Sequence, residues 1–207
     1  MGHGMSAPAA PNVDGPWDFG TFSIVCSRGA RPDLKASFWA LYEESFGPLR
    51  IRAAARQVLT EDEFSAELDD PTTWKYVALD SSGEPAGLAT LTDDVSTMPW
   101  ISPEYFAHRY PHESKRGAVF YIGVLLVRPD MRGHAVFART VTCMAERVTA
   151  ARGVAAFDFC GYNDQDLRLG SATAKILSRE NAFEVSAVDV QTYYVARATG
   201  YEARIDS

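Results

Sequence analysis

The sequence has no apolar run approaching the roughly 20 residues needed to span a bilayer, and residues 1–16 hold no apolar stretch of the signal-peptide type. Basic residues are also in the minority, since 20 Lys and Arg stand against 27 Asp and Glu, a formal net charge of −7. Non-specific binding to nucleic acids depends on clustered Lys and Arg. We therefore expect a cytoplasmic protein that binds neither membranes nor nucleic acids.

Cysteine and histidine are scarce and scattered. Cys26, Cys143 and Cys160 form no C-x-x-C pair and are odd in number, so we expect reduced and mostly buried thiols. His108 and His112 have the spacing of one helical turn, but Pro111 between them would interrupt a helix. The sequence therefore predicts no metal site.

The remaining composition is that of an ordinary globular protein, with 46% hydrophobic and 23% charged residues among 207. Residues 1–16 are rich in Gly, Ala and Pro and offer little to bury, which predicts a disordered tail. We find no internal repeat and no interdomain linker. We expect one domain over 17–207.

The first half of the domain alternates between strand and helix patterns. Apolar residues at every second position predict a strand over 19–26. Pro32 suits the first turn of a helix, whose apolar face recurs at spacings of three and four: Leu34, Phe38, Leu41, Tyr42 and Phe46. A second helical stretch is predicted over 49–58. Thr60-Glu61-Asp62-Glu63 forms a capping box that opens a third helix.

The third helix carries an acidic run whose members are Glu61, Asp62, Glu63, Glu67, Asp69 and Asp70. We interpret this run as a solvated helix face, with its first members favoured by the helix dipole. The alternative is a surface that binds a cation or a polyamine.

The second half begins with two strands, near 74–79 and 86–92, joined by a turn-forming string and predicted to form an antiparallel hairpin. A long connection over 94–115 contains one short helix capped by Ser102. A very apolar strand at 118–127, a helix, a strand at 154–160, a helix within 164–181 and a terminal strand or strand pair within 183–197 complete the order. This is a mixed α/β domain with a central β-α-β unit.

The segment 127–135, read V-R-P-D-M-R-G-H-A, passes from a buried strand through a short turn into a helix. Such a turn points several free backbone N–H groups and the positive end of the helix dipole at one place. A phosphate is the ligand that such a place accepts best, and Arg132 adds a charge-assisted contact. On local physics alone, a plain strand-to-helix connection explains the segment equally well.

The run V-R-P-D-M-R-G between an apolar strand and an amphipathic helix resembles the acetyl-CoA-binding motif of the GNAT N-acetyltransferase superfamily, V-x-P-x-x-[RQ]-x-x-G-x-[GA]. The order of elements also resembles the GNAT fold over about residues 18–200. The resemblance implies a mostly antiparallel central sheet flanked by helices, with acetyl-CoA or another acyl-CoA as co-substrate. It also implies that the CoA pyrophosphate is held by Arg132, Gly133, His134, Ala135, Val136 and Phe137, with Asn163 at the start of the following helix.

The sequence departs from the family at three positions. Ala135 stands where the family has Gly, which is tolerable if its φ is negative, and Phe137 replaces a small residue. Since Phe137 belongs to the apolar stripe of its helix, we expect it to pack in the core. Ser178 stands where many relatives carry the Tyr that protonates the leaving thiolate.

Acyl transfer to an amine needs a base for the ammonium and an acid for the thiolate. Tyr121, in the apolar strand, and Glu104 and His108, in the long connection, are the catalytic candidates. Backbone groups of Leu125, Leu126 and Val127 are the candidate donors to the thioester oxygen. Asp158 in an apolar strand, and Tyr193 and Tyr194 in the last one, are further candidates for the acceptor site or are structural.

The sequence thus favours an acyl-CoA-dependent N-acyltransferase that acts on a primary amine of a small molecule or peptide. An acyl carrier protein is an alternative donor. The alternative function is a catalytically degenerate module of the same fold that binds a ligand or a protein partner. A homodimer is compatible with either.

Overall fold

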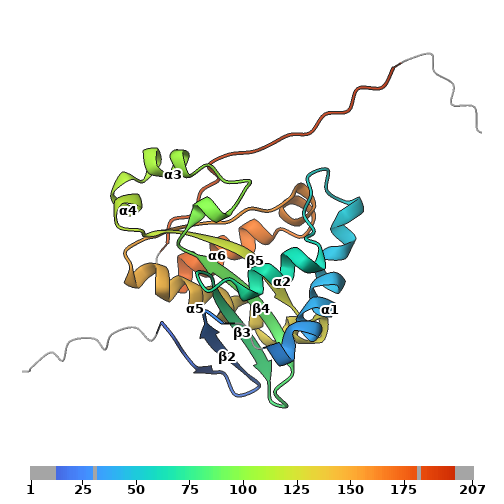
Figure 1. Ribbon diagram of the computed structural model, residues 1–207, viewed down its shortest axis with the longest axis vertical. Helices are drawn as coiled ribbons and strands as arrows, with labels where there is room; N and C mark the ends of the chain where they lie inside the picture. Colours follow the sequence, from blue (N-terminus) through green and yellow to red (C-terminus); the bar gives the residue numbers. More distant parts are fainter. Residues whose placement is uncertain (1–12, 30–31, 181–182, 199–207) are drawn as a thin grey trace, which may run out of the picture.

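The computed structural model describes residues 13–29, 32–180 and 183–198. Its centre is a six-stranded sheet in the order β1-β2-β3-β4-β5-β6 (Figure 1). Neighbouring strands are antiparallel except β5 and β6, which are parallel. The strands are β1 (Trp17–Asp18), β2 (Phe22–Ser27), β3 (Trp74–Asp80), β4 (Pro85–Thr92), β5 (Val119–Val127) and β6 (Val154–Ala156).

The α-helices are α1 (Lys35–Phe46), α2 (Glu61–Asp69), α3 (Pro103–Arg109), α4 (Pro111–Lys115), α5 (Val136–Ala150) and α6 (Leu169–Glu180). Within the described residues, 3₁₀ turns lie at Pro32–Leu34, Gly47–Ile51, Val95–Thr97 and Pro129–His134, and a π-helical turn lies at Tyr162–Asp166. The predicted β-α-β unit is β5-α5-β6, and its parallel strands are confirmed.

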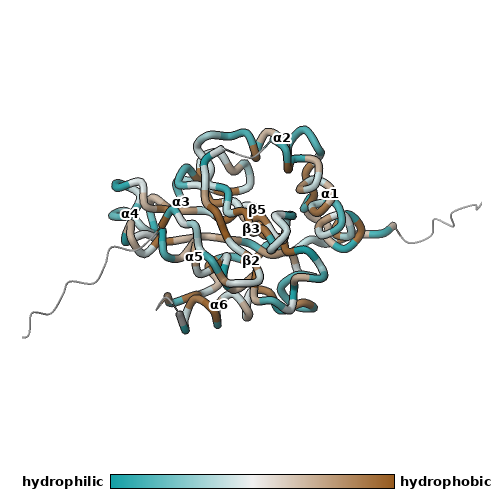
Figure 2. The backbone as a smooth tube through the Cα atoms, turned by 90° about the horizontal axis from the view of Figure 1, so that it is seen from below, coloured by the Kyte–Doolittle hydropathy of each residue, from teal (hydrophilic) through white to brown (hydrophobic). Residues whose placement is uncertain are grey.

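The sheet is covered on both faces, and each face has its own core. Helices α1 and α2 pack on one face, where Val77, Leu88 and Val124 point toward them. Helices α5 and α6 pack on the other, against Tyr76 and Ala89 among others. In Figure 2 the apolar strands lie in the middle layer, between α1 and α2 on one side and α5 and α6 on the other. Successive strand residues thus supply the two cores alternately.

The capping box at the start of α2 is confirmed, because the Glu63 N–H donates to Thr60 Oγ1 and the Thr60 N–H donates to the Glu63 carboxylate. The helix predicted over 49–58 is wrong. Only Gly47–Ile51 is helical, as a 3₁₀ turn, and the chain from residue 54 to 60 is irregular. Between Leu49 and Val58 no side chain is fully buried, so no packed apolar face stabilises a longer helix here.

The strand predictions near the C-terminus also need correction. The strand predicted over 154–160 ends at Ala156. Residues 183–198 form no strand, so the predicted terminal strand or strand pair is wrong. A strand needs a ladder partner, and none is present for this segment within the described residues.

None of the helices within residues 13–29, 32–180 and 183–198 has the length and hydropathy of a membrane span. Those same ranges contain no group of three metal-ligating side chains. Residues 1–12 of the expected tail lie outside the described residues. Asp14, which follows them, pairs with Arg147 of α5 at 2.6 Å.

Candidate active site

The first feature of the site is the free edge of β5, by which we mean the backbone groups of Leu125 and Val127. The Arg128 N–H donates to the Ala86 carbonyl of β4 at 2.9 Å, so alternation turns the groups of Leu125 and Val127 away from β4. On that side β6 pairs with β5 only as far as Tyr121. Beyond Tyr121, no strand in the described part of the chain completes the ladder, so these groups are available to a ligand.

The free edge leads directly into the turn at residues 129–138. A 3₁₀ turn occupies Pro129–His134, Ala135 follows, and α5 starts at Val136 without a side-chain cap. The N–H groups of the first α5 turn have no acceptor within the helix. Arg132 and His134 are exposed beside them. The turn therefore has the donors and the positive charge that an anion needs.

Ala135 and Phe137 are the two positions of the turn that depart from the family's motif. Ala135 has a φ of +63°, in the left-handed region, so the negative φ that would make alanine tolerable at this position is not found. Between β5 and α5 the chain forms the 3₁₀ turn Pro129–His134, and the left-handed Ala135 changes the chain direction between this turn and α5. Gly would adopt this φ without strain. Phe137 packs against the core beneath α5, as its place in the apolar stripe predicts.

The second feature is the carboxyl group of a partly buried glutamate, a member of the acidic run that we predicted to be a solvated helix face. Glu67 of α2 accepts a hydrogen bond from Thr90 Oγ1 of β4 at 2.6 Å. The Val124 N–H donates to the same Thr90 oxygen at 2.8 Å, which leaves the hydroxyl proton for Glu67. Glu67 follows buried Phe64 by three residues, so the helical spacing alone could have placed it on the inner face.

A bulge in the sheet makes the room for this carboxyl group. The register between β4 and β5 shifts between Ala89 and Leu91, opposite Gly123 and Val124. A β-carbon at Gly123 would lie 2.9 Å from both Glu67 Oε1 and Thr90 Oγ1, closer than real contacts allow. Gly123 is itself exposed in the middle of β5. Because Gly123 has no side chain, the Glu67 carboxyl group fits beside the exposed part of β5, just before the free edge.

The environment of Glu67 changes its acidity. Burial raises the pKa of Glu67, while the Thr90 hydrogen bond and the positive charge of Lys75 act in the opposite direction. Lys75 is fully buried, and its ammonium group donates to the backbone carbonyls of Arg28 and Asp70. A carboxyl group with a raised pKa is a better proton acceptor once it is ionised.

The third feature is a hydrogen-bonded group around Tyr121. This buried tyrosine of β5 donates to Asp158, which follows β6, and accepts from Trp100 Nε1 at 2.8 Å. Burial and the Asp158 charge raise the pKa of Tyr121 above its ordinary value, so it stays protonated. The negative charge of Glu67 contributes to the same shift. Asp158 is hydrogen-bonded to Tyr121 and the charge of Glu67 also affects Tyr121, so the three side chains belong to one region of the sheet.

The other candidates do not join this region. Glu104 and His108 are exposed on α3, where Glu104 accepts a hydrogen bond from the capping Ser102. Tyr193 and Tyr194 are exposed in the extended C-terminal segment. Ser178, in the position of the family's tyrosine, donates to the Phe183 carbonyl at 3.2 Å. The structure places Asn163 in the π-helical turn before α6, partly buried.

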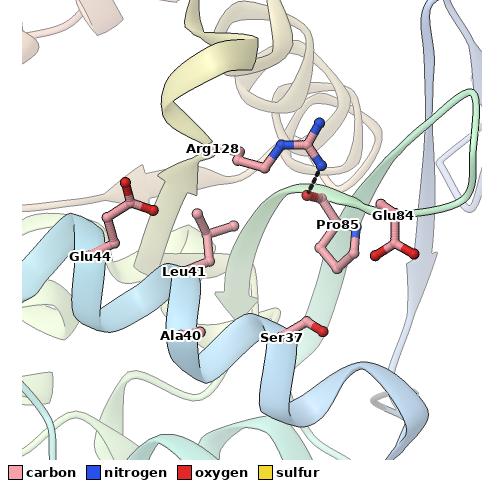
Figure 3. Close-up of a pocket in the computed structure, with 7 residues that line it drawn as sticks. All are labelled: Ser37, Ala40, Leu41, Glu44, Glu84, Pro85 and Arg128. Carbon is pink, nitrogen blue, oxygen red and sulfur yellow. Dashed lines mark hydrogen bonds between the residues drawn. The ribbon is translucent and has the colours of Figure 1, made fainter.

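A surface hollow of about 330 Å³ lies between α1 and the start of β4 (Figure 3). The Arg128 guanidinium group on its wall donates to the Pro85 carbonyl and pairs with Asp80 at 2.8 Å. Glu44 and Glu84 add two carboxylates to the lining. Because the arginine is already paired and acids line the wall, this hollow does not suit a phosphate.

Comparison with known proteins supports the fold. No protein-family profile matches the sequence, and no curated protein matches it significantly. An aminoglycoside antibiotic 6′-N-acetyltransferase from Acinetobacter baumannii superposes with a TM-score of 0.51 at 9% identity, over 86% of this chain and 99% of that one. An integron cassette protein from the mobile metagenome of V. cholerae gives 0.50 at 14% identity, over 87% and 94%. The chain thus has the GNAT acetyltransferase fold, which confirms the resemblance at the level of fold.

Proposed function

We propose that this protein transfers an acyl group, in the simplest case acetyl, from an acyl-CoA directly to a primary amine of a small molecule or peptide. The observation that carries the proposal is the continuity of the free edge of β5 with the turn at 129–138. Together they form one line of backbone donors that ends in an anion-binding turn. An acyl-CoA has complementary groups along its length: a thioester, the amides of the pantetheine arm, and a pyrophosphate at the far end.

The donor would lie along this line. The amides of the pantetheine arm pair with the backbone of Leu125 and Val127 as an added strand would. The pyrophosphate accepts from the N–H groups of the turn, including Gly133 and Val136, with Arg132 and His134 beside it. Gly133 has open space around its Cα, so a phosphate can approach the backbone closely there. Asn163, in the π-helical turn before α6, is the further candidate for a contact with the donor.

The acceptor amine would enter beside Glu67 and Asp158. Two carboxyl groups near Tyr121 favour a cationic amine over a neutral or anionic acceptor. Glu67 takes one proton from the ammonium group and frees the nitrogen lone pair to attack the thioester carbonyl carbon. The new C–N bond forms, the C–S bond breaks, and the thiolate leaves with the electron pair of that bond.

Two groups assist the later stages. A backbone N–H of the free edge donates to the carbonyl oxygen as negative charge develops on it. Tyr121, which stays protonated, is the candidate to stabilise the departing thiolate with its hydroxyl group, and the second proton lost by the amine converts thiolate to thiol. Ser178 cannot replace it, because its hydroxyl group is bonded to the Phe183 carbonyl.

The test is an acyl-transfer assay with acetyl-CoA and a panel of small primary amines, followed by release of free thiol and by the mass of the product. The expected result is thiol release that depends on the amine and a product heavier by one acetyl group. Matched alcohols in place of the amines serve as controls. Binding of acetyl-CoA without amine-dependent thiol release would contradict the proposal and favour the degenerate module.

A further inference from the structure

The C-terminal segment 183–198 is apolar along much of its length and almost wholly exposed. Phe183 and Val185 pack against the core beneath α6. From there the segment leaves the body of the protein and runs past α3 into solvent (Figure 1). Val190, Tyr194 and Val195 are then 80%, 90% and 96% exposed. This is a costly arrangement, since each of these side chains gains about 1.5–3 kcal/mol when buried.

The same segment has the pattern of a β-strand. In an extended chain alternate side chains share a face, which brings Val188, Val190, Thr192 and Tyr194 to one side. All four are β-branched or aromatic, the residue types that strands prefer. Asp189 and Gln191 fall on the opposite side. One apolar face and a partly polar face are typical of an outer strand that covers a core.

The sheet offers an edge for such a strand. β6 is the last strand in the order and is only three residues long, and among the described residues its one partner is β5. Its outer edge therefore presents unpaired backbone groups in the described part of the chain. An open edge of this kind is a template for another extended segment.

We propose that the segment 188–195 adds to the β6 edge of a second copy of this chain, and that the two copies exchange these strands reciprocally. The chain itself carries both parts of the interface, an exposed strand and an open edge. A two-fold axis joins each segment to the β6 edge of the other copy, so the outer edges of both β6 strands are covered. The direction of the segment, away from its own body beyond Val185, favours the second copy over its own β6.

The experiment measures the mass of the full-length chain in solution by light scattering or sedimentation, from about 1 to 100 µM, a range typical of weak to moderate dimers. The expected species is a dimer with twice the 22.7 kDa chain mass. Val190→Pro removes a ladder N–H, and Tyr194→Asp places a charge on the apolar face. Because both residues are exposed in the single chain, neither change disturbs its core. Each should raise the dimer dissociation constant at least about tenfold.

The matched control is Ile51→Asp, which places the same charge on another large apolar side chain that is 92% exposed, after α1. It should leave the dissociation constant unchanged. A wild-type chain that stays monomeric at the highest protein concentration, about 100 µM, would overturn the proposal. A dimer that resists both segment variants, or one that the control weakens equally, would overturn it as well.

Discussion

Replacing Glu67 by Gln tests the chemistry of the candidate site with the smallest change of shape. The amide keeps an oxygen that can accept from Thr90 Oγ1, so the contact that positions α2 against the bulge survives. What disappears is the negative charge and the ability to take a proton. We expect the variant to fold and to bind acetyl-CoA as the wild type does.

The expected loss is large in the rate of acyl transfer. A positioned general base contributes about 10²–10⁴-fold, which corresponds to about 2.7–5.4 kcal/mol at about 1.36 kcal/mol for each factor of ten. The pH profile should change with it. In the wild type the rate rises with pH as Glu67 ionises, above the usual range of a glutamate because burial raises its pKa. In the Glu67→Gln variant this rise disappears.

Stability should change in the opposite direction to activity. Since the pKa of Glu67 is raised in the folded protein, the stability it contributes is fully present below the pKa of the unfolded chain. That contribution is lost as pH rises through the folded pKa. The amide of the Glu67→Gln variant is neutral throughout, so at neutral pH the free energy of unfolding of the variant should exceed that of the wild type.

The assay combines amine-dependent thiol release, acetyl-CoA titration and chemical denaturation across pH. Glu61→Gln is the matched control, because Glu61 is an exposed carboxylate of the same helix. It should leave the transfer rate and the acetyl-CoA affinity unchanged, and lower the free energy of unfolding by at most about 0.3–1 kcal/mol because it removes a negative charge from the start of α2. A Glu67→Gln variant that keeps the wild-type rate and pH profile would refute the assignment, and one that is less stable at neutral pH would show a structural role instead.

Four further changes have defined outcomes. Gly123→Ala puts a β-carbon against Glu67 and Thr90 and should lower the transfer rate about 100-fold with acetyl-CoA affinity retained; an unchanged rate would contradict the bulge geometry. Ala135→Gly relieves the left-handed strain and should add about 1 kcal/mol of stability, measured by denaturant titration; a loss would refute the strain. Phe137→Ala should cost about 2 kcal/mol without weakening acetyl-CoA binding, and tighter binding in calorimetry would show that Phe137 obstructs the site. Thr60→Ala removes the cap of α2 and should lower stability by about 1 kcal/mol, and no change in melting would contradict that contribution.

The elements that the sequence predicted well are those whose residues act locally. Thr60 and Glu63 cap α2 through contacts three residues apart, and the spacing alone contains that information. The hairpin of β3 and β4 depends on a turn-forming string between two apolar runs. The strand-turn-helix at 127–138 likewise combines a local motif with its context.

The features that the sequence left undetermined or assigned wrongly are those that distant residues decide. The position of Glu67 at the bulge depends on Gly123, which is far away in the sequence and belongs to another element. The left-handed φ of Ala135 follows from how the 3₁₀ turn and α5 must join at the end of β5, which a residue pattern does not specify. The strand-like pattern of 188–195 gave no information on whether a partner lies in the same chain.

Acyl-CoA binding by the free edge of β5 and the turn after it is the property on which the proposed function depends most directly. Calorimetric titration with acetyl-CoA measures this without knowledge of the acceptor. We expect a dissociation constant of about 1–100 µM, weakened at least about tenfold by Arg132→Glu at the turn and unchanged by Arg109→Glu, an exposed arginine of α3. Absence of heat up to about 1 mM acetyl-CoA, or equal weakening by both variants, would contradict the central claim.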